Sequence, residues 1–259
     1  LDLYANIRPT RTRQGVPALT EMDLVVVREN TEGFYADRTM FAGNGEFMPT
    51  PDLALAVRKI TRHGSERVVR VACDIAMTRQ KRLTIVHKGN VLKQSDGLFR
   101  AAAQNVLVDY PEIDAEEVLV DAMASMLVRE PGAYDVMVST NMFGDILSNE
   151  AAELSGGLGL APSINAGDEH AIAQASHGAA PDIAGTDTAN PVALIVSAAM
   201  LLDWKGRRLG ENVLIEAAAA AGRAVDDLLA VPETRTPDLD GALGTRAFGD
   251  ALAARIGDA

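Results

Sequence analysis

The chain has 259 residues, of which 47% are hydrophobic and 23% charged, a composition typical of a globular protein with one large domain or two smaller ones. Its formal net charge of −12 would repel nucleic acids and anionic membranes, so we predict neither as a partner. The longest apolar run, residues 191–202, is shorter than the ~20 residues of a membrane-spanning helix. The single cysteine, Cys73, cannot form an intrachain disulfide, which favours a reducing, cytoplasmic location.

Apolar runs and helical periodicities alternate along the chain. Helices are expected after most of the strands, and residues 36–50 are expected to form a loop or hairpin. In chain order, the pattern predicts strands at 22–27, 83–86, 118–120 and 134–138, and helices at 51–64, 65–76, 93–108, 143–154, 191–204 and 211–229, with a last helix after 245. A glycine-rich break at 154–162 is a candidate domain boundary. This alternation predicts an α/β fold with a buried, mostly parallel sheet.

Polar residues that could bind a ligand or transfer a proton follow the predicted strands. Arg28, Lys88, Asp121 and Asp145 each lie at or just past the end of an apolar strand, and Tyr35 follows Arg28 closely. Because the carboxyl ends of parallel strands gather at one edge of a sheet, where α/β proteins bind ligands, these five residues could meet there.

Three oxygen-bearing side chains among them suggest a metal site. Asp145 and Asn149 are four residues apart, so they share one face of the predicted helix. With Asp121 they offer three oxygen ligands and no cysteine or histidine, which suits Mg²⁺ or Mn²⁺. The simpler interpretation is an aspartate that favours the positive end of a helix and an asparagine on a solvated face.

Basic and phenolic side chains complete the candidate site. The arginines that could bind carboxylates are Arg8, Arg28 and one of Arg11 or Arg13. Lys88 and Tyr35 are candidates for acid–base chemistry. The alternatives are surface ion pairs and a half-buried aromatic. Taken together, these residues predict a site for a small polycarboxylate that undergoes proton transfer. Neither the common dinucleotide-binding glycine motif nor a P-loop is present.

Four segments resemble the NAD(P)-dependent decarboxylating dehydrogenases of the isocitrate and isopropylmalate dehydrogenase family. They are LDLYANIRP, VVVRENTEGFY, VHKGNV with VDAMASMLV, and VSTNMFGDILSNEAAELSGGLGLAPS running on to HGAAPDIAGTDTANP. Their order and spacing agree along essentially the whole chain. The resemblance implies two open α/β domains in an obligate dimer. We expect a cofactor-binding large domain at 1–12 and 156–259, and a small domain with the dimer interface at 13–155. It also implies that the family's N-terminal segment is absent from this sequence.

The resemblance also assigns roles to individual residues. Arg8 and Arg28 would bind substrate carboxylates, Tyr35 would help protonate the enol after CO₂ leaves, Lys88 would help remove the hydroxyl proton, and Asp121 and Asp145 would bind the metal. In the family, the lysine and the first aspartate reach into the neighbouring subunit's site. The expected assembly is therefore a homodimer with shared active sites.

The cofactor loop is carried over in the same way. The matching positions are His177, Gly178, Ala180, Asp182, Ile183 and Asn190. Asp182 is the informative residue, because a carboxylate there can accept hydrogen bonds from an adenosine ribose and would repel a 2′-phosphate. The expected cofactor is therefore NAD rather than NADP.

Two departures from the family pattern bear on activity. Asn149 stands where the family usually has aspartate, so we expect weaker metal binding, and Gln174 stands where a glutamate is usual. The lead interpretation is an enzyme that oxidises and decarboxylates a 3-substituted malate, with an isocitrate- or homoisocitrate-like acid preferred from ENTEGFY and VHKGNV. Isopropylmalate, D-malate and tartrate remain alternatives. The two departures motivate an interpretation of another class, a non-catalytic regulatory subunit.

Overall fold

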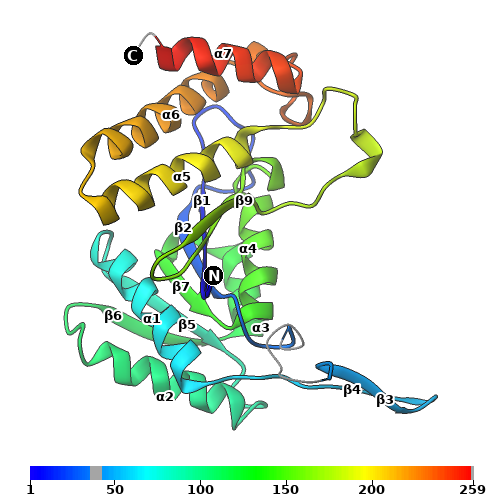
Figure 1. The fold of residues 1–259 in the computed structure, drawn as a ribbon, viewed down its shortest axis with the longest axis vertical. Helices are drawn as coiled ribbons and strands as arrows, with labels where there is room; N and C mark the ends of the chain where they lie inside the picture. The colour runs from blue at the N-terminus through cyan, green and yellow to red at the C-terminus, as the bar shows by residue number, and fades with distance from the viewer. Residues whose placement is uncertain (36–42, 258–259) are drawn as a thin grey trace. The chain divides into compact units, whose positions relative to one another are not determined.

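The computed structural model describes residues 1–35 and 43–257 (Figure 1), and the chain splits into two compact units. Unit 1 comprises Leu1–Ile7, Asp23–Glu150 and Asn165–His170, and unit 2 comprises Arg8–Met22, Ala151–Ile164 and Ala171–Ala259. These units are not divided as the predicted domains are, because residues 1–7 and 165–170 group with 23–150, and residues 8–22 group with the other unit. The roles of the two domains stay a prediction.

Unit 1 is organised by a mostly parallel sheet. Its strands are β2 (Asp23–Glu29), β5 (Arg82–His87), β6 (Asp114–Leu119) and β7 (Val136–Ser139). They lie in the order β6-β5-β7-β2, and the β6/β5, β5/β7 and β7/β2 pairs are all parallel. The sheet continues through β1 (Ala5–Arg11) and β8 (Pro162–Ala166) to β9 (Ala171–Ala175), with β1 and β8 passing into unit 2. The predicted α/β class is confirmed.

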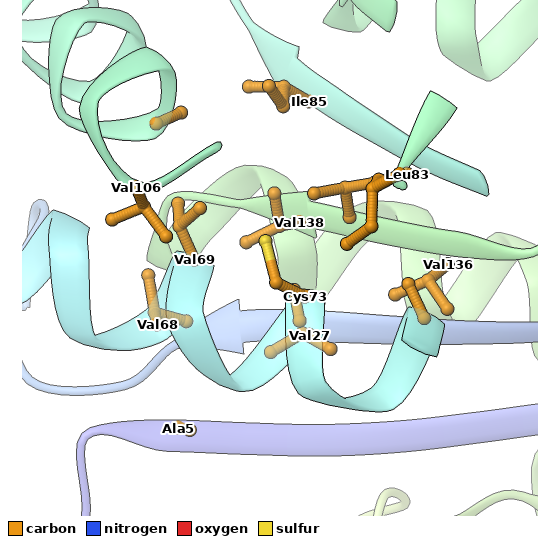
Figure 2. Close-up of a cluster of buried hydrophobic side chains, with 14 of the residues drawn as sticks. Ala5, Val27, Val68, Val69, Cys73, Leu83, Ile85, Val106, Val136 and Val138 are labelled. Atoms are coloured by element: carbon orange, nitrogen blue, oxygen red, sulfur yellow. The ribbon is translucent and has the colours of Figure 1, made fainter. Parts of the chain in front are cut away.

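Helices in unit 1 follow the strands as the alternation predicted. They are α1 (Arg62–Met77), α2 (Ser95–Leu107), α3 (Val120–Arg129) and α4 (Asn141–Ser155), of which residues up to Glu150 belong to this unit. Val68, Val69 and Cys73 of α1 are fully buried in one hydrophobic cluster with Val27 and Val138 of the sheet (Figure 2). Cys73 is therefore a core residue.

Unit 2 has a separate core made by helices from the end of the chain. The helices are α5 (Val192–Leu209), α6 (Asn212–Ala230) and α7 (Thr245–Gly257). Val192, Val225, Leu228, Leu229 and Phe248 are almost fully buried together. Among the described residues, no helix combines the length and apolar character that crossing a bilayer would require.

The helix predicted at 51–64 is wrong. That region contains β4 (Leu53–Ala56), which pairs antiparallel with β3 (Glu46–Thr50), and α1 begins only at Arg62. Every residue of both strands is exposed, so no core selects between helical and alternating spacing, and backbone pairing decides. Thr61 caps α1 by accepting a hydrogen bond from the Gly64 N–H. The predicted loop or hairpin is confirmed for 46–50, while 36–42 lies outside the described residues.

Candidate functional site

Arg28, at the end of β2, is the centre of the first group of polar residues. Its Nε and Nη2 atoms donate to Asn141 Oδ1 at 2.9 and 2.6 Å, and its Nη1 donates to Asp145 Oδ1 at 2.5 Å. The guanidinium lies 5.6 Å from the centre of the Tyr35 ring. Burial lowers the pKa of Arg28, and the charge of Asp145 opposes that effect. The structure therefore brings Arg28, Tyr35 and Asp145 together, as the sequence predicted.

Asn141 is part of this group although it had no role in the sequence prediction. It is 2% exposed, and its Nδ2 atom donates to the Glu32 carbonyl at 3.0 Å. Both ends of its amide are thus satisfied inside the protein, which fixes the face it presents to Arg28. Its position directly after a predicted strand, in the sequence Ser-Thr-Asn before a helix, could have marked it as a candidate site residue.

Gly144 allows α4 to approach Arg28 closely. A Cβ atom at this position would lie 2.8 Å from Arg28 Cβ, so Gly144→Ala should push α4 away and lower the free energy of unfolding by about 1–3 kcal/mol. Gly97→Ala in α2 is the matched control, because a Cβ there meets nothing within 4 Å. Alanine should stabilise that helix by about 0.5–1 kcal/mol. Urea unfolding should show a lower free energy of unfolding for Gly144→Ala and a higher one for Gly97→Ala than for the wild type. Changes of the same sign in both variants would contradict the role given to Gly144.

The two glutamates of the ENTEG segment are buried and have structural roles. Glu29, 2% exposed, accepts hydrogen bonds from the Thr31 N–H and hydroxyl and from the Glu32 N–H at 2.7–2.8 Å. Glu32, 5% exposed, accepts from the Thr61 N–H at 2.7 Å and from its hydroxyl at 2.6 Å. These contacts shape the turn that carries the chain from Arg28 to Tyr35.

Lys88 and Asp121 form a second group. The Lys88 Nζ atom donates to Asp121 Oδ1 at 2.5 Å. Lys88 follows β5, and Asp121 lies in the first turn of α3, where a helix favours negative charge. The hydrogen bond from Lys88 lowers the pKa of the Asp121 carboxyl. Lys88 is thus paired with one of the predicted metal ligands.

His87 shapes the loop that carries Lys88. Its Nδ1 atom accepts a hydrogen bond from the Gly89 N–H at 2.9 Å, and its Nε2 atom faces Glu117 at 3.4 Å. The first contact requires Nδ1 to be unprotonated. The side chain is 6% exposed, and burial, followed by the positive charge of Arg100, lowers the pKa of His87.

This lowered pKa predicts a pH-dependent stability. The unfolded chain takes up a proton on His87 near pH 6.5 while the folded chain resists it, so the contribution of His87 is lost as the pH falls below about 6.5. Asparagine offers an acceptor for the Gly89 N–H without titrating. Urea unfolding at pH 7.5 and 5.5 should show a larger loss on acidification for the wild type than for His87→Asn, and equal losses would contradict the assignment.

The arginines near the start of the chain are in unit 2. Arg8 lies in β1 and is 6% exposed, and its role toward a substrate stays a prediction. Arg11 and Arg13 both pair with Asp226 of α6. Arg13 is 5% exposed, so this ion pair gives the two arginines a structural role.

The predicted cofactor loop is exposed and belongs to unit 2. Residues 177–187 are exposed throughout, and Asp182 and Ile183 lie in a short 3₁₀ helix, Pro181–Ile183. Ala180 precedes it with a φ of 42°. Asn190 accepts from the Val192 N–H and donates to Asp238, both at 3.0 Å. His177 and Gly178 complete the loop, whose exposed backbone is accessible to a ligand.

The predicted metal ligands come from two helices, α4 and α3. Within residues 1–35 and 43–257, no three histidine, cysteine, aspartate or glutamate side chains are grouped so that they could hold a metal ion. Asp145 and Asn149 lie on α4, whereas Asp121 pairs with Lys88. The side chains of Asp145 and Asp121 are 32% and 64% exposed, respectively, so both can be reached from outside.

Comparison with known proteins identifies the family. The family model for isocitrate/isopropylmalate dehydrogenase matches residues 1–252. A 3-isopropylmalate/3-methylmalate dehydrogenase of Methanocaldococcus jannaschii is 44% identical over 262 residues, covering 99% of this chain and 74% of that protein. An isocitrate/homoisocitrate dehydrogenase of Thermus thermophilus is 45% identical over 253 residues, covering 97% of this chain and 71% of that protein.

A solved structure agrees with these sequence relatives. The crystal structure of isocitrate dehydrogenase from Methylococcus capsulatus has a TM-score of 0.88 and 39% identity, and the match covers 98% of this chain and 74% of that one. Its fold is therefore shared along nearly the whole chain. The chain belongs to the isocitrate/isopropylmalate dehydrogenase family and is a decarboxylating hydroxy-acid dehydrogenase.

Proposed function

We propose that this enzyme oxidises and decarboxylates a 3-substituted malate with NAD as the hydride acceptor, and that it prefers an isocitrate- or homoisocitrate-like acid. The observation that carries the proposal is the buried Arg28, whose neighbours Tyr35 and Asp145 add a proton donor and a metal ligand. The names of similar proteins divide between isocitrate/homoisocitrate and 3-isopropylmalate/3-methylmalate. The Arg-Glu-Asn-Thr-Glu-Gly-Phe-Tyr segment favours the first group.

Each polar group has a part in the proposed reaction. The guanidinium of Arg28 forks onto a substrate carboxylate, and Arg8 supplies a second positive charge. Lys88 takes up the proton of the substrate hydroxyl as hydride leaves the carbon. After CO₂ is lost, Tyr35 donates a proton to the enol. NAD, which the loop of His177 to Ile183 and Asn190 would hold, would supply the hydride acceptor.

The metal proposal follows from the donor chemistry. Asp145 and Asn149 of one protomer and Asp121 of a second would supply only oxygen ligands, which fits Mg²⁺ or Mn²⁺. A divalent cation held by these residues would supply Lewis acidity to the site. Asn149 removes a negative charge from this set, so Asn149→Asp should lower the Mg²⁺ concentration that gives half-maximal rate. An unchanged Mg²⁺ requirement would refute the assignment of Asn149.

The proposal includes a homodimer with shared active sites, in which Arg28, Tyr35 and Asp145 of one protomer would meet Lys88 and Asp121 of the other. Apolar side chains on the outside of the protein also favour association. Phe47, Met48 and Leu53 of the β3/β4 hairpin are 46–63% exposed, and Met126 of α3 and Ile146 of α4 are 39% and 55% exposed.

Subunit complementation tests the shared site. Lys88→Ala and Asp145→Ala should each lose nearly all activity alone, but a refolded mixture should regain roughly a quarter of wild-type activity. Half of the dimers would then be mixed, each with one complete site of two. Two variants that stay inactive together while forming mixed dimers would place Lys88 and Asp145 in the same protomer's site.

Cofactor choice is carried by Asp182. Its exposed carboxylate is suited to accept hydrogen bonds from a ribose and to repel a 2′-phosphate. The ratio of kcat/KM for NAD to that for NADP should be well above one, and Asp182→Asn should lower it. A wild-type preference for NADP would overturn this part of the proposal.

A rate panel decides the substrate. The protein is assayed with NAD and Mg²⁺ or Mn²⁺ on isocitrate, homoisocitrate, 3-isopropylmalate, D-malate and tartrate, and the highest kcat/KM should belong to one of the first two. The departures at Asn149 and Gln174 motivate one alternative, a non-catalytic regulatory subunit, and the presence of Tyr35, Lys88, Asp121 and Asp145 argues against it. No turnover on any of the acids, with ligand binding retained, would support that alternative.

A further inference from the structure

Arg58, just after β4, is nearly buried and connects three segments of unit 1. Its Nη1 atom donates to Ser95 Oγ at 2.8 Å and to Asp96 Oδ1, and its Nη2 atom donates to Thr140 Oγ1 at 2.9 Å. Its guanidinium also lies 5.3 Å from the centre of the Phe143 ring. The side chain is 8% exposed, so these contacts are made in a largely water-free environment.

Asp96 connects Arg58 to the proposed proton acceptor. Its side chain is fully buried, with Oδ1 facing Arg58 and Oδ2 accepting a hydrogen bond from the Lys88 backbone N–H at 2.5 Å. The Lys88 carbonyl accepts from the N–H groups of Val91 and Leu92 at 3.0 and 2.8 Å. Both backbone polar groups of Lys88 are therefore fixed, and the direction of its side chain is set by this frame.

The other end of the Arg58 contacts lies at the start of α4. Thr140 precedes the helix, and Phe143 is in its first turn, between Asn141 and Asp145. Those two residues hold Arg28. One guanidinium thus joins the loop of Lys88 to the helix that presents the Arg28 group.

We propose that Arg58 and Asp96 are positioning residues that fix the backbone of the Lys88 loop, from which Lys88 reaches the site that it shares with a partner subunit, and this inference rests on the proposed role of Lys88. Neither residue touches the reacting atoms. Arginine is needed because it donates in several fixed directions at once, whereas lysine provides a single point of charge. A small displacement of a catalytic group lowers the reaction rate strongly. Loss of the Arg58 and Asp96 contacts should therefore slow the chemical step more than it weakens cofactor binding.

Arg58→Lys is the principal test, because it keeps a positive charge beside the buried Asp96 and so preserves folding. It should lower kcat by roughly 10- to 100-fold with the KM for NAD unchanged. Arg62→Met is the matched control, since Arg62 is an exposed arginine in the first turn of α1 that pairs with Glu66. The control should keep wild-type kcat. A kcat for Arg58→Lys equal to that of the control would overturn the proposal.

A double variant shows whether Arg58 acts through Lys88. When Lys88→Ala already removes the amine, adding Arg58→Lys should lower the residual rate by no more than about twofold, because coupled residues are non-additive. A loss that multiplies fully with that of Lys88→Ala would assign Arg58 to another step. A lower urea midpoint with unchanged kcat would assign it to stability alone. Both results would refute the positioning role.

Hydrogen exchange supplies a readout that does not depend on turnover. The Lys88 amide, bonded to a fully buried carboxylate, should exchange slowly in the wild type and in Arg62→Met, and clearly faster in Arg58→Lys. Equal exchange rates of the Lys88 amide in the wild type and both variants would show that Arg58 does not fix the Lys88 backbone. If no acid on the panel is turned over, the proposed function fails, while this measurement still decides whether Arg58 fixes the Lys88 backbone.

Discussion

Replacing Lys88 with alanine is expected to lower kcat by about 10²- to 10⁴-fold, the usual contribution of a positioned acid–base group. The Lys88 Nζ atom is held 2.5 Å from Asp121 Oδ1 on a loop whose backbone is fixed by Asp96 and His87. Alanine removes the amine without adding bulk. Single-turnover NADH formation at saturating hydroxy acid and NAD would measure the loss in the chemical step.

The exposed Lys93→Ala variant in the same segment is the control and should keep wild-type kcat. Small primary amines added to Lys88→Ala should restore part of the rate, because they can occupy the space left by the side chain. A Lys88→Ala enzyme with wild-type kcat would remove Lys88 from the reaction.

Arg28→Lys should raise the KM for the hydroxy acid by roughly 30- to 150-fold. Arg28 makes three hydrogen bonds, two to Asn141 and one to Asp145, and offers a planar fork that lysine cannot reproduce. Losing a charge-assisted contact to a carboxylate costs about 2–3 kcal/mol. Initial rates at varied acid and fixed saturating NAD would measure the change.

The KM for NAD should stay unchanged in Arg28→Lys, since the predicted cofactor loop is a separate part of the chain. The exposed Arg62→Lys is the matched control and should leave both KM values unchanged. If Arg28→Lys raised the KM for NAD and not that for the acid, Arg28 would belong to the cofactor rather than to the substrate.

Strands with buried apolar side chains could be predicted from the sequence, and a strand with buried polar side chains could not. The strands β2, β5 and β7 are buried apolar runs, and their positions were predicted within a few residues. No strand was predicted for β1, because it buries Asn6, Arg8 and Thr10 at 2–6% exposure. Those side chains carry no hydrophobic alternation. The helix predicted at 51–64 is wrong for a different reason, since the apolar residues of β3 and β4 are exposed and their spacing marks no buried face.

The candidate site divides in the same way. Arg28, Tyr35 and Asp145 were expected together because each lies close to a strand end, and the structure places them in contact. The pairing of Arg58 with Asp96 joins residues 38 positions apart and has no periodic signal. Long-range contacts of this kind depend on how the elements pack, which a single sequence does not encode in its local pattern.

Glu32 carries a consequence for how this region opens. Its carboxylate holds the first turn of α1 through Thr61, while its own backbone is part of the segment that leads to Tyr35. Fraying of the helix start must therefore release that segment as well, so the two behave as one foldon rather than as independent local fluctuations. Amides of Glu32 and Thr61 should report a common opening free energy, and distinct values would separate them.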